Sequence, residues 1–295
     1  MNERETFTPA VTVIGGGTMG QGIATATLQA GLRTTVVDVS TDALDRATAT
    51  IRRRIERAFG SKAADMLAGL TTSADLEDAV SRADVVIEAV PELPDLKVDI
   101  FTRLATAAPA NALLVSNTST LSISPLAEAC AGSDRVIGMH FFNPAHKMPL
   151  VEIVVPLSAS EATLRDALAL TAALGKDPVV VKDVPGFVTS RLGLLLGTEA
   201  MRMVDEGVAS AGDIDKAMRL GYGHPMGPLE LADLVGLDAR LNNLRSMHAR
   251  SGSDQYLAPG ILERLVKMGR LGKKTGSGFF EYDSNGSIVG PGQLP

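Results

Sequence analysis

Short apolar runs alternate with longer amphipathic stretches through the first two thirds of the chain. Four to six apolar, mostly β-branched residues in a row are typical of strands in a sheet that is covered on both faces. We expect such strands at residues 11–14, 34–37, 85–89, 113–116, 136–138, 150–155 and 178–181. Because helical stretches separate these runs, the pattern predicts a parallel sheet with helices on both sides.

The predicted helices of this part lie at residues 21–30, 42–59 and 161–174. The second of them carries Ile51, Ile55 and Phe59 on one face, with arginines between them. Glycines directly follow the first and third stretches, and glycine is a common helix stop. These helices supply the apolar faces that a parallel sheet needs.

The pattern changes after Pro185 and Gly186, because no strand-like run follows. Helices are expected instead at residues 191–206, 211–220, 228–234, 239–250 and 261–268. The sequence therefore predicts an α/β domain over residues 1–185 and a smaller all-α domain over residues 186–295. The stretch 283–295 is rich in glycine, serine and proline, so we expect it to be loose.

Composition narrows the class of protein. The chain carries 28 Lys and Arg against 34 Asp and Glu, a net charge of −6, which argues against a nucleic-acid partner. A single cysteine, Cys130, excludes an internal disulfide. No apolar run reaches the roughly 20 residues of a membrane span, and residues 1–8 hold no apolar signal core. We therefore expect a cytoplasmic protein that does not bind membranes.

A glycine-rich loop follows the first predicted strand. Residues 15–20 read Gly-Gly-Gly-Thr-Met-Gly, which matches G-x-G-x-x-G, and a helix opens directly behind them. Such a loop lets a pyrophosphate approach the free N–H groups of the helix. The expected contacts are Gly15, Gly17, Thr18, Met19 and Gly20.

Asp38 ends the second predicted strand, where a carboxylate accepts hydrogen bonds from the adenosine ribose and repels a 2′-phosphate. The sequence therefore predicts a Rossmann-type domain that binds NAD rather than NADP. The alternative is a glycine turn without a ligand.

One histidine stands out among four. His140 follows the predicted strand 136–138, at the sheet edge where ligands of open α/β sheets bind. Glu152 sits in the middle of an apolar strand, where a carboxylate needs a partner. If the two strands lie side by side, Glu152 fixes the tautomer of His140 and stabilises its protonated form. The alternative is a core histidine without a catalytic role.

Polar residues also follow two other predicted strands. Asn117 and Ser119 come after strand 113–116, where they could bind a substrate oxygen or the nicotinamide amide, although Ser119 could equally cap a helix before Leu121. Glu92 and Lys97 follow strand 85–89, or form an exposed pair at a helix start. Together with the glycine loop, these residues favour hydride transfer at an alcohol. No His, Cys, Asp and Glu spacing indicates a metal site.

From about Val11 to Tyr282 the sequence resembles the L-3-hydroxyacyl-CoA dehydrogenases, in particular the bacterial 3-hydroxybutyryl-CoA type. Its motifs are Val-Ile-Gly-Gly-Gly-Thr-Met-Gly (13–20), Ser-Asn-Thr-Ser (116–119), His-Phe-Phe-Asn-Pro (140–144), Leu-Val-Glu (150–152), Pro-Met-Gly-Pro (225–228) and Leu-Gly-Lys-Lys-Thr-Gly (271–276).

The resemblance implies specific roles. His140 is the expected general base, Glu152 orients it, Ser119 binds the reacting oxygen region, and Asn143 holds substrate and nicotinamide. Positions that match cofactor contacts of the family are Asp38, Glu92, Lys97, Asn117 and Lys274. The resemblance further implies that the helical domain forms a homodimer interface and closes over an acyl-CoA substrate.

Two departures from the family pattern bear on the substrate. Ser190 stands where the family usually has asparagine, and a hydroxyl offers fewer hydrogen bonds than an amide. The positions that contact CoA in the family fall on Arg54 and Ser61. Arg54 and Lys62 could meet CoA phosphates, or they could simply belong to a solvated helix face.

The sequence thus predicts NAD-dependent oxidation of an L-3-hydroxyacyl-CoA, with a short acyl chain favoured. Ser190 and the altered CoA positions leave a related 3-hydroxy acid, or an acyl group on a carrier protein, as an alternative. A non-catalytic NAD-binding protein of the same fold is a third possibility, which the combination of His140, Glu152 and Ser119 disfavours.

Overall fold

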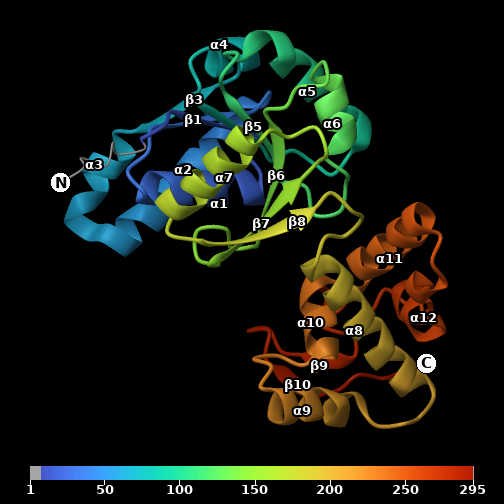
Figure 1. Ribbon diagram of the computed structural model, residues 1–295. Helices are drawn as coiled ribbons and strands as arrows, with labels where there is room; N and C mark the ends of the chain where they lie inside the picture. Colours follow the sequence, from blue (N-terminus) through green and yellow to red (C-terminus); the bar gives the residue numbers. More distant parts are fainter. Residues whose placement is uncertain (1–7, 295) are drawn as a thin grey trace. The chain divides into compact units, whose positions relative to one another are not determined.

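The computed structural model describes residues 8–294 of the chain. The predicted absence of a signal core concerns residues that lie almost entirely outside this range. The described chain divides into two compact units, of which the first ends at Phe187 and the second begins at Val188 (Figure 1). Within the described range, every helix is too short or too polar to cross a membrane.

The first unit is built on one sheet of eight strands in the order β3-β2-β1-β4-β5-β6-β7-β8. Every neighbouring pair is parallel except β6 and β7, which are antiparallel, so the predicted mostly parallel sheet is confirmed. The strands are β1 (Val11–Ile14), β2 (Thr34–Val37), β3 (Leu70–Ser73), β4 (Val85–Glu88), β5 (Leu113–Ser116), β6 (Val136–Phe141), β7 (Leu150–Val155) and β8 (Asp177–Lys182).

Helices cover both faces of this sheet (Figure 1). Two apolar cores result, one on each face, and the central strands β1, β2, β4, β5, β6 and β7 contribute side chains to both. One core includes side chains of α1 (Thr18–Gln29), α2 (Thr41–Phe59), α3 (Ala63–Leu67) and α7 (Glu161–Ala173). The other includes side chains of α4 (Leu76–Val80), α5 (Pro94–Ala107) and α6 (Ser124–Ala129). A 3₁₀ turn, η1 (Gly60–Lys62), joins α2 to α3.

Strand β3 is an element that the hydrophobic pattern did not predict. Its sequence, Leu-Thr-Thr-Ser, is mostly polar, and its residues are exposed or half-buried. It lies at the sheet edge and pairs only with β2, and the hydroxyls of Thr35 and Thr71 lie 2.8 Å apart across this pair. An edge strand needs few apolar residues, which explains why its pattern is weak.

The second unit is mainly helical, as predicted. Its helices are α8 (Thr189–Asp205), α9 (Ala211–Tyr222), α10 (Pro228–Val235), α11 (Leu237–Ser251) and α12 (Gly260–Lys267), with the 3₁₀ turns η2 (Asp254–Tyr256) and η3 (Lys273–Thr275). The expectation of an all-α domain with a loose tail is wrong in one respect. Strands β9 (Phe280–Tyr282) and β10 (Ile288–Pro291) form an antiparallel hairpin that includes most of that tail.

Asp233 of α10 anchors this hairpin to the helices. Its side chain is fully buried and accepts hydrogen bonds from the backbone N–H groups of Phe279 (3.0 Å) and Phe280 (2.9 Å) and from the hydroxyl of Tyr282 (3.1 Å). Burial raises the pKa of Asp233 from 3.8 to about 6, although these three hydrogen bonds oppose the rise. The hairpin is therefore held by a carboxylate whose pKa is raised to about 6.

We expect this raised pKa to give the second unit a pH-dependent stability. Between about pH 4 and pH 6 the folded state holds a proton on Asp233 that the unfolded chain has released. The contribution of Asp233 to the free energy of unfolding therefore falls as the pH rises through this window, by up to about 3 kcal/mol. An Asp233→Asn variant lacks this dependence.

Urea unfolding followed by tyrosine fluorescence tests the expectation, because all three tyrosines lie in the second unit and the chain has no tryptophan. The difference in unfolding free energy between the wild type and Asp233→Asn should shrink from pH 4.5 to pH 6.5. Parallel pH profiles of the two proteins would contradict it.

Candidate active site

The glycine loop joins β1 to α1 and can be built only from glycine at two positions. Gly15 has φ +107°, and a Cβ there would lie 2.7 Å from the carbonyl oxygen of Ala89. A Cβ on Gly20 would lie 1.8 Å from the carbonyl oxygen of Gly15. Gly17 is the N-cap of α1 and has open space beside it. The loop thus leaves room for a group at the free N–H groups of the helix.

Asp38 supports the loop from the end of β2. Its carboxylate accepts hydrogen bonds from the backbone N–H of Gly16 (2.8 Å) and of Ser40 (3.0 Å). A pocket of about 730 Å³ opens beside them, lined by residues 14–19, by Asp38 and by side chains of α5 such as Ile100. The pocket and the open helix end match the adenosine and pyrophosphate of a dinucleotide, so the residues present fit NAD.

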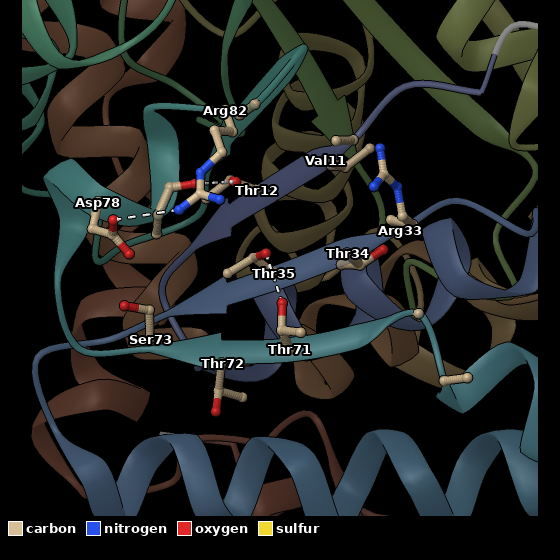
Figure 2. Close-up of a pocket in the computed structure, with 15 residues that line it drawn as sticks. Val11, Thr12, Arg33, Thr34, Thr35, Thr71, Thr72, Ser73, Asp78 and Arg82 are labelled. Carbon is tan, nitrogen blue, oxygen red and sulfur yellow. Dashed lines mark hydrogen bonds and ion pairs between the residues drawn. The ribbon is translucent and has the colours of Figure 1, made fainter.

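A second hollow lies apart from this site. Figure 2 shows it beside β1, β2, β3 and α4, and its volume is about 620 Å³. Arg82 and Asp78 form an ion pair at one side, and Arg33 lies at another. None of the predicted site residues lines this hollow. The candidate chemistry therefore belongs to the first pocket and the neighbouring strand ends.

His140 and Glu152 face each other across the antiparallel pair β6 and β7. They are direct register partners, and His140 Nδ1 lies 2.8 Å from Glu152 Oε2. Glu152 is fully buried and His140 is 7% exposed. The rings of Phe142 and Phe187 lie 4.4 and 5.9 Å from the imidazole, measured between centroids. The predicted pairing of the two residues is present.

A buried ion pair joins the C-terminal end of β4 to helix α5. Lys97 of α5 is fully buried, and its Nζ lies 2.6 Å from Glu88 Oε1 and 3.3 Å from Glu92 Oε2. Glu88, also fully buried, accepts further hydrogen bonds from Val90 N–H (2.8 Å) and from the Ser116 hydroxyl (2.6 Å). The exposed helix-start pair considered for Glu92 and Lys97 is therefore wrong.

Glu92 in turn orders the loop after β5. Its Oε1 accepts hydrogen bonds from the backbone N–H of Ser119 (3.0 Å) and Thr120 (3.2 Å) and from the hydroxyl of Thr118. Burial raises the pKa of Glu92, but the Lys97 ammonium and these hydrogen bonds outweigh it, so the pKa lies below its ordinary value. Glu92 is thus a fixed anion beside Ser119.

Asn117 connects this loop to the histidine strand. Its side-chain oxygen accepts a hydrogen bond from the backbone N–H of Phe141, the residue after His140, at 2.9 Å. The hydroxyl that accepts the N–H of Leu121 belongs to Thr118 (2.8 Å), and Leu121 lies outside any helix, so the capping alternative for Ser119 is wrong. Asn143 lies two residues beyond β6 and is exposed.

The remaining predicted residues lie elsewhere in the chain. Arg54 is half-buried on α2, and its Nη1 is buried without a hydrogen-bond partner within residues 8–294. Lys62 is exposed in η1. Ser190 lies in α8 and Lys274 in η3, where Lys274 Nζ pairs with Asp238 Oδ1 at 2.6 Å. The last two belong to the second unit, and their part in the site stays a prediction.

Sequence reasoning missed Glu88 and Ser116, which are hydrogen-bonded to each other at the ends of β4 and β5. A signal was present, because Glu88 is a lone carboxylate at the end of an apolar strand, the same feature that singled out Glu152. The contact with Glu88 also leaves Lys97 fully buried, whereas its spacing from Glu92 suggested an exposed side chain. Among residues 8–294 there is no group of three or more His, Cys, Asp or Glu that could hold a metal ion.

The arrangement supplies a proton acceptor, a dinucleotide pocket and hydrogen-bond donors at one sheet edge. The imidazole is oriented by a carboxylate at one nitrogen, which leaves its other nitrogen for proton exchange. These are the parts that hydride transfer between an alcohol and a nicotinamide requires.

Known proteins resemble the chain over nearly all of its length. The family model of the 3-hydroxyacyl-CoA dehydrogenase NAD binding domain matches residues 10–184, and that of the C-terminal domain matches residues 186–282. A Bacillus subtilis protein named "Probable 3-hydroxybutyryl-CoA dehydrogenase" is 38% identical over 283 residues, which cover 94% of this chain and 98% of the relative.

Two solved structures have the same fold. The (S)-3-hydroxybutyryl-CoA dehydrogenase of Ralstonia eutropha superposes with a TM-score of 0.89 at 38% identity, covering 93% of this chain and 99% of the other. A diketoreductase described as acting on dicarbonyl compounds superposes with a TM-score of 0.81 at 31% identity, covering 94% and 100%. On these matches and on its NAD pocket, the chain belongs to the 3-hydroxyacyl-CoA dehydrogenase family.

Proposed function

We propose that the chain is an NAD-dependent dehydrogenase that interconverts L-3-hydroxyacyl-CoA and 3-ketoacyl-CoA, with short acyl chains such as 3-hydroxybutyryl preferred. The observation that carries this proposal is the 2.8 Å contact between His140 and Glu152 at the sheet edge that also holds the dinucleotide pocket. The match to both family models supports the substrate class.

His140 acts as the general base of the oxidation. Its Nε2 accepts the proton of the 3-hydroxyl group, while Nδ1 donates to Glu152 and keeps the ring in one tautomer. The buried carboxylate of Glu152 stabilises the imidazolium that forms. NAD, when bound, supplies the hydride acceptor. Phe142 and Phe187 pack against the imidazole and reduce its contact with water.

The loop after β5 and Asn143, two residues beyond β6, position the reactants. Ser119, which Glu92 holds by its backbone N–H, binds the reacting oxygen region, and Asn143 holds substrate and nicotinamide. Ser190, where the family usually has asparagine, offers a substrate fewer hydrogen bonds than an amide would. Asn117 fixes the backbone beside His140 and so keeps the base in place.

The wider assignments follow the same proposal. The first unit binds NAD and carries the catalytic pair, and the second unit closes over the acyl-CoA and forms a homodimer. Exposed apolar side chains of the second unit, among them Leu192, Leu220 and Tyr222, support a role of that unit in association. The acidic composition and single cysteine support a cytoplasmic location without nucleic-acid or membrane partners.

We expect His140→Gln to lower kcat for NADH-dependent reduction of acetoacetyl-CoA by at least about 100-fold, because the proton donor of this direction is lost. Glu152→Gln should lower kcat less, since an amide can still hold the ring but stabilises the imidazolium poorly. His248→Gln is the matched control, because His248 lies on α11 of the second unit, where its Nδ1 lies 3.1 Å from the carbonyl oxygen of Ser253. Undiminished turnover in His140→Gln would remove this residue from the mechanism.

A free 3-hydroxy acid, or a small dicarbonyl compound in the reductive direction, is the second candidate substrate. Ser190 in place of asparagine favours it, as does the likeness to a diketoreductase. Carrier-bound acyl groups form a variant of the same candidate. A non-catalytic NAD-binding role is disfavoured, because a pure binding protein has no need of a buried His–Glu pair.

The CoA assignment predicts that Arg54 and Lys62 meet phosphates of the CoA. Acetoacetyl-CoA should then have a kcat/KM about tenfold or more above that of acetoacetyl-pantetheine, which lacks those phosphates. Arg54→Met should reduce this ratio, whereas Arg52→Met should not, because Arg52 is exposed on the same helix and pairs with Glu56. Equal kcat/KM for both thioesters would favour the second candidate.

A further inference from the structure

The charged side chains at the C-terminal ends of β4 and β5 do not sum to zero. The network contains the carboxylates of Glu88 and Glu92 and a single ammonium, that of Lys97. Glu88 and Lys97 are fully buried, and the Glu92 side chain is 34% exposed. The group therefore carries one net negative charge, and two of its three members lie where water and salt screen weakly.

This charge lies at the end of β4, on the side of the sheet where the second half of a dinucleotide is expected. The strand order reverses between β1 and β4, and a dinucleotide binds across such a point. The glycine loop and Asp38 mark the adenosine half at β1 and β2. The nicotinamide half therefore falls on the side of β4, β5 and β6, where the network and His140 are found.

We propose that the net negative charge of the Glu88–Lys97–Glu92 network biases the site toward the oxidised cofactor, with Glu88 as the residue that sets this charge. The oxidised nicotinamide ring carries a positive charge that is lost when the ring accepts a hydride. A fixed anion near the ring stabilises the positively charged, oxidised ring and has no such effect on the neutral, reduced ring.

Glu88 is suited to this role by its fixed position. Three hydrogen bonds, from Val90 N–H, Lys97 Nζ and the Ser116 hydroxyl, hold both of its oxygens. It also holds Lys97, which pairs with Glu92 and thus with the loop of Ser119. Glu88 is accordingly a positioning residue, because it acts through neighbours and through its field.

The test compares dissociation constants for NAD⁺ and NADH without any acyl substrate. Glu88→Gln preserves the shape of the side chain and removes the net charge, so the ratio Kd(NAD⁺)/Kd(NADH) should rise about tenfold. The double variant Glu88→Gln/Lys97→Met leaves only Glu92 charged and should return the ratio to within about threefold of the wild type. NADH binding is read from its fluorescence and NAD⁺ binding from competition against it.

Two further variants make the result decisive. Ser116→Ala removes a hydrogen bond to Glu88 without changing the charge and should leave the ratio within about twofold of the wild type. Glu92→Gln also brings the net charge to zero, at a less buried position, and should raise the ratio even if Glu88→Gln does not fold. A ratio that stays constant in the variants that lose the net charge would overturn the proposal, as would a double variant shifted as far as Glu88→Gln.

The inference rests on NAD binding and on the hydride transfer of the proposed function, but its readout is separate from turnover. A protein that fails to reduce acetoacetyl-CoA still reports the ratio of the two dissociation constants. A protein that turns over normally with an unchanged ratio in Glu88→Gln refutes only the role of the network.

Discussion

Two neighbouring strands can be joined by a short connection only if the chain reverses between them, because parallel neighbours need a long crossover. The turn between β6 and β7 supplies that reversal in a sheet that is otherwise parallel. The register of this pair sets His140 opposite Glu152, and a slip of one residue would turn one of them to the other face. The candidate base depends on this single pairing.

Buried or half-buried carboxylates hold three segments of the fold in place. Glu88 holds the end of β4 against α5, Asp183 accepts the N–H groups of Ile123 and Ser124 at the start of α6, and Asp233 holds the terminal hairpin. Each accepts several hydrogen bonds, which offsets the cost of removing a charge from water. These segments are thus held by hydrogen bonds to carboxylates in addition to apolar packing.

Much of the fold was predictable because its signals are local. The apolar runs located seven of the eight sheet strands, and the helical periodicity located the helices of the second unit. Strand β3 was missed because a strand at the sheet edge can be mostly polar, as Leu70 and its neighbours are. The terminal hairpin was missed because its anchor, Asp233, lies 46 residues before Phe279 in the sequence. The pairing of His140 with Glu152 was inferred from their chemistry. The burial of Lys97 could not be inferred, because it depends on contacts between segments that are far apart in the sequence.

The contact between Gly15 and Gly20 has a consequence for how this chain can change over evolutionary time. The carbonyl oxygen of Gly15 occupies the space that a side chain on Gly20 would need, and Gly15 itself is confined by Ala89. A new side chain at either position cannot be accommodated by adjusting a flexible neighbour, since both obstacles are backbone atoms. Substitutions in this loop are therefore tolerated at positions such as Gly17 but not at Gly15 or Gly20, so the spacing of these two glycines is constrained more strongly than the residues around them.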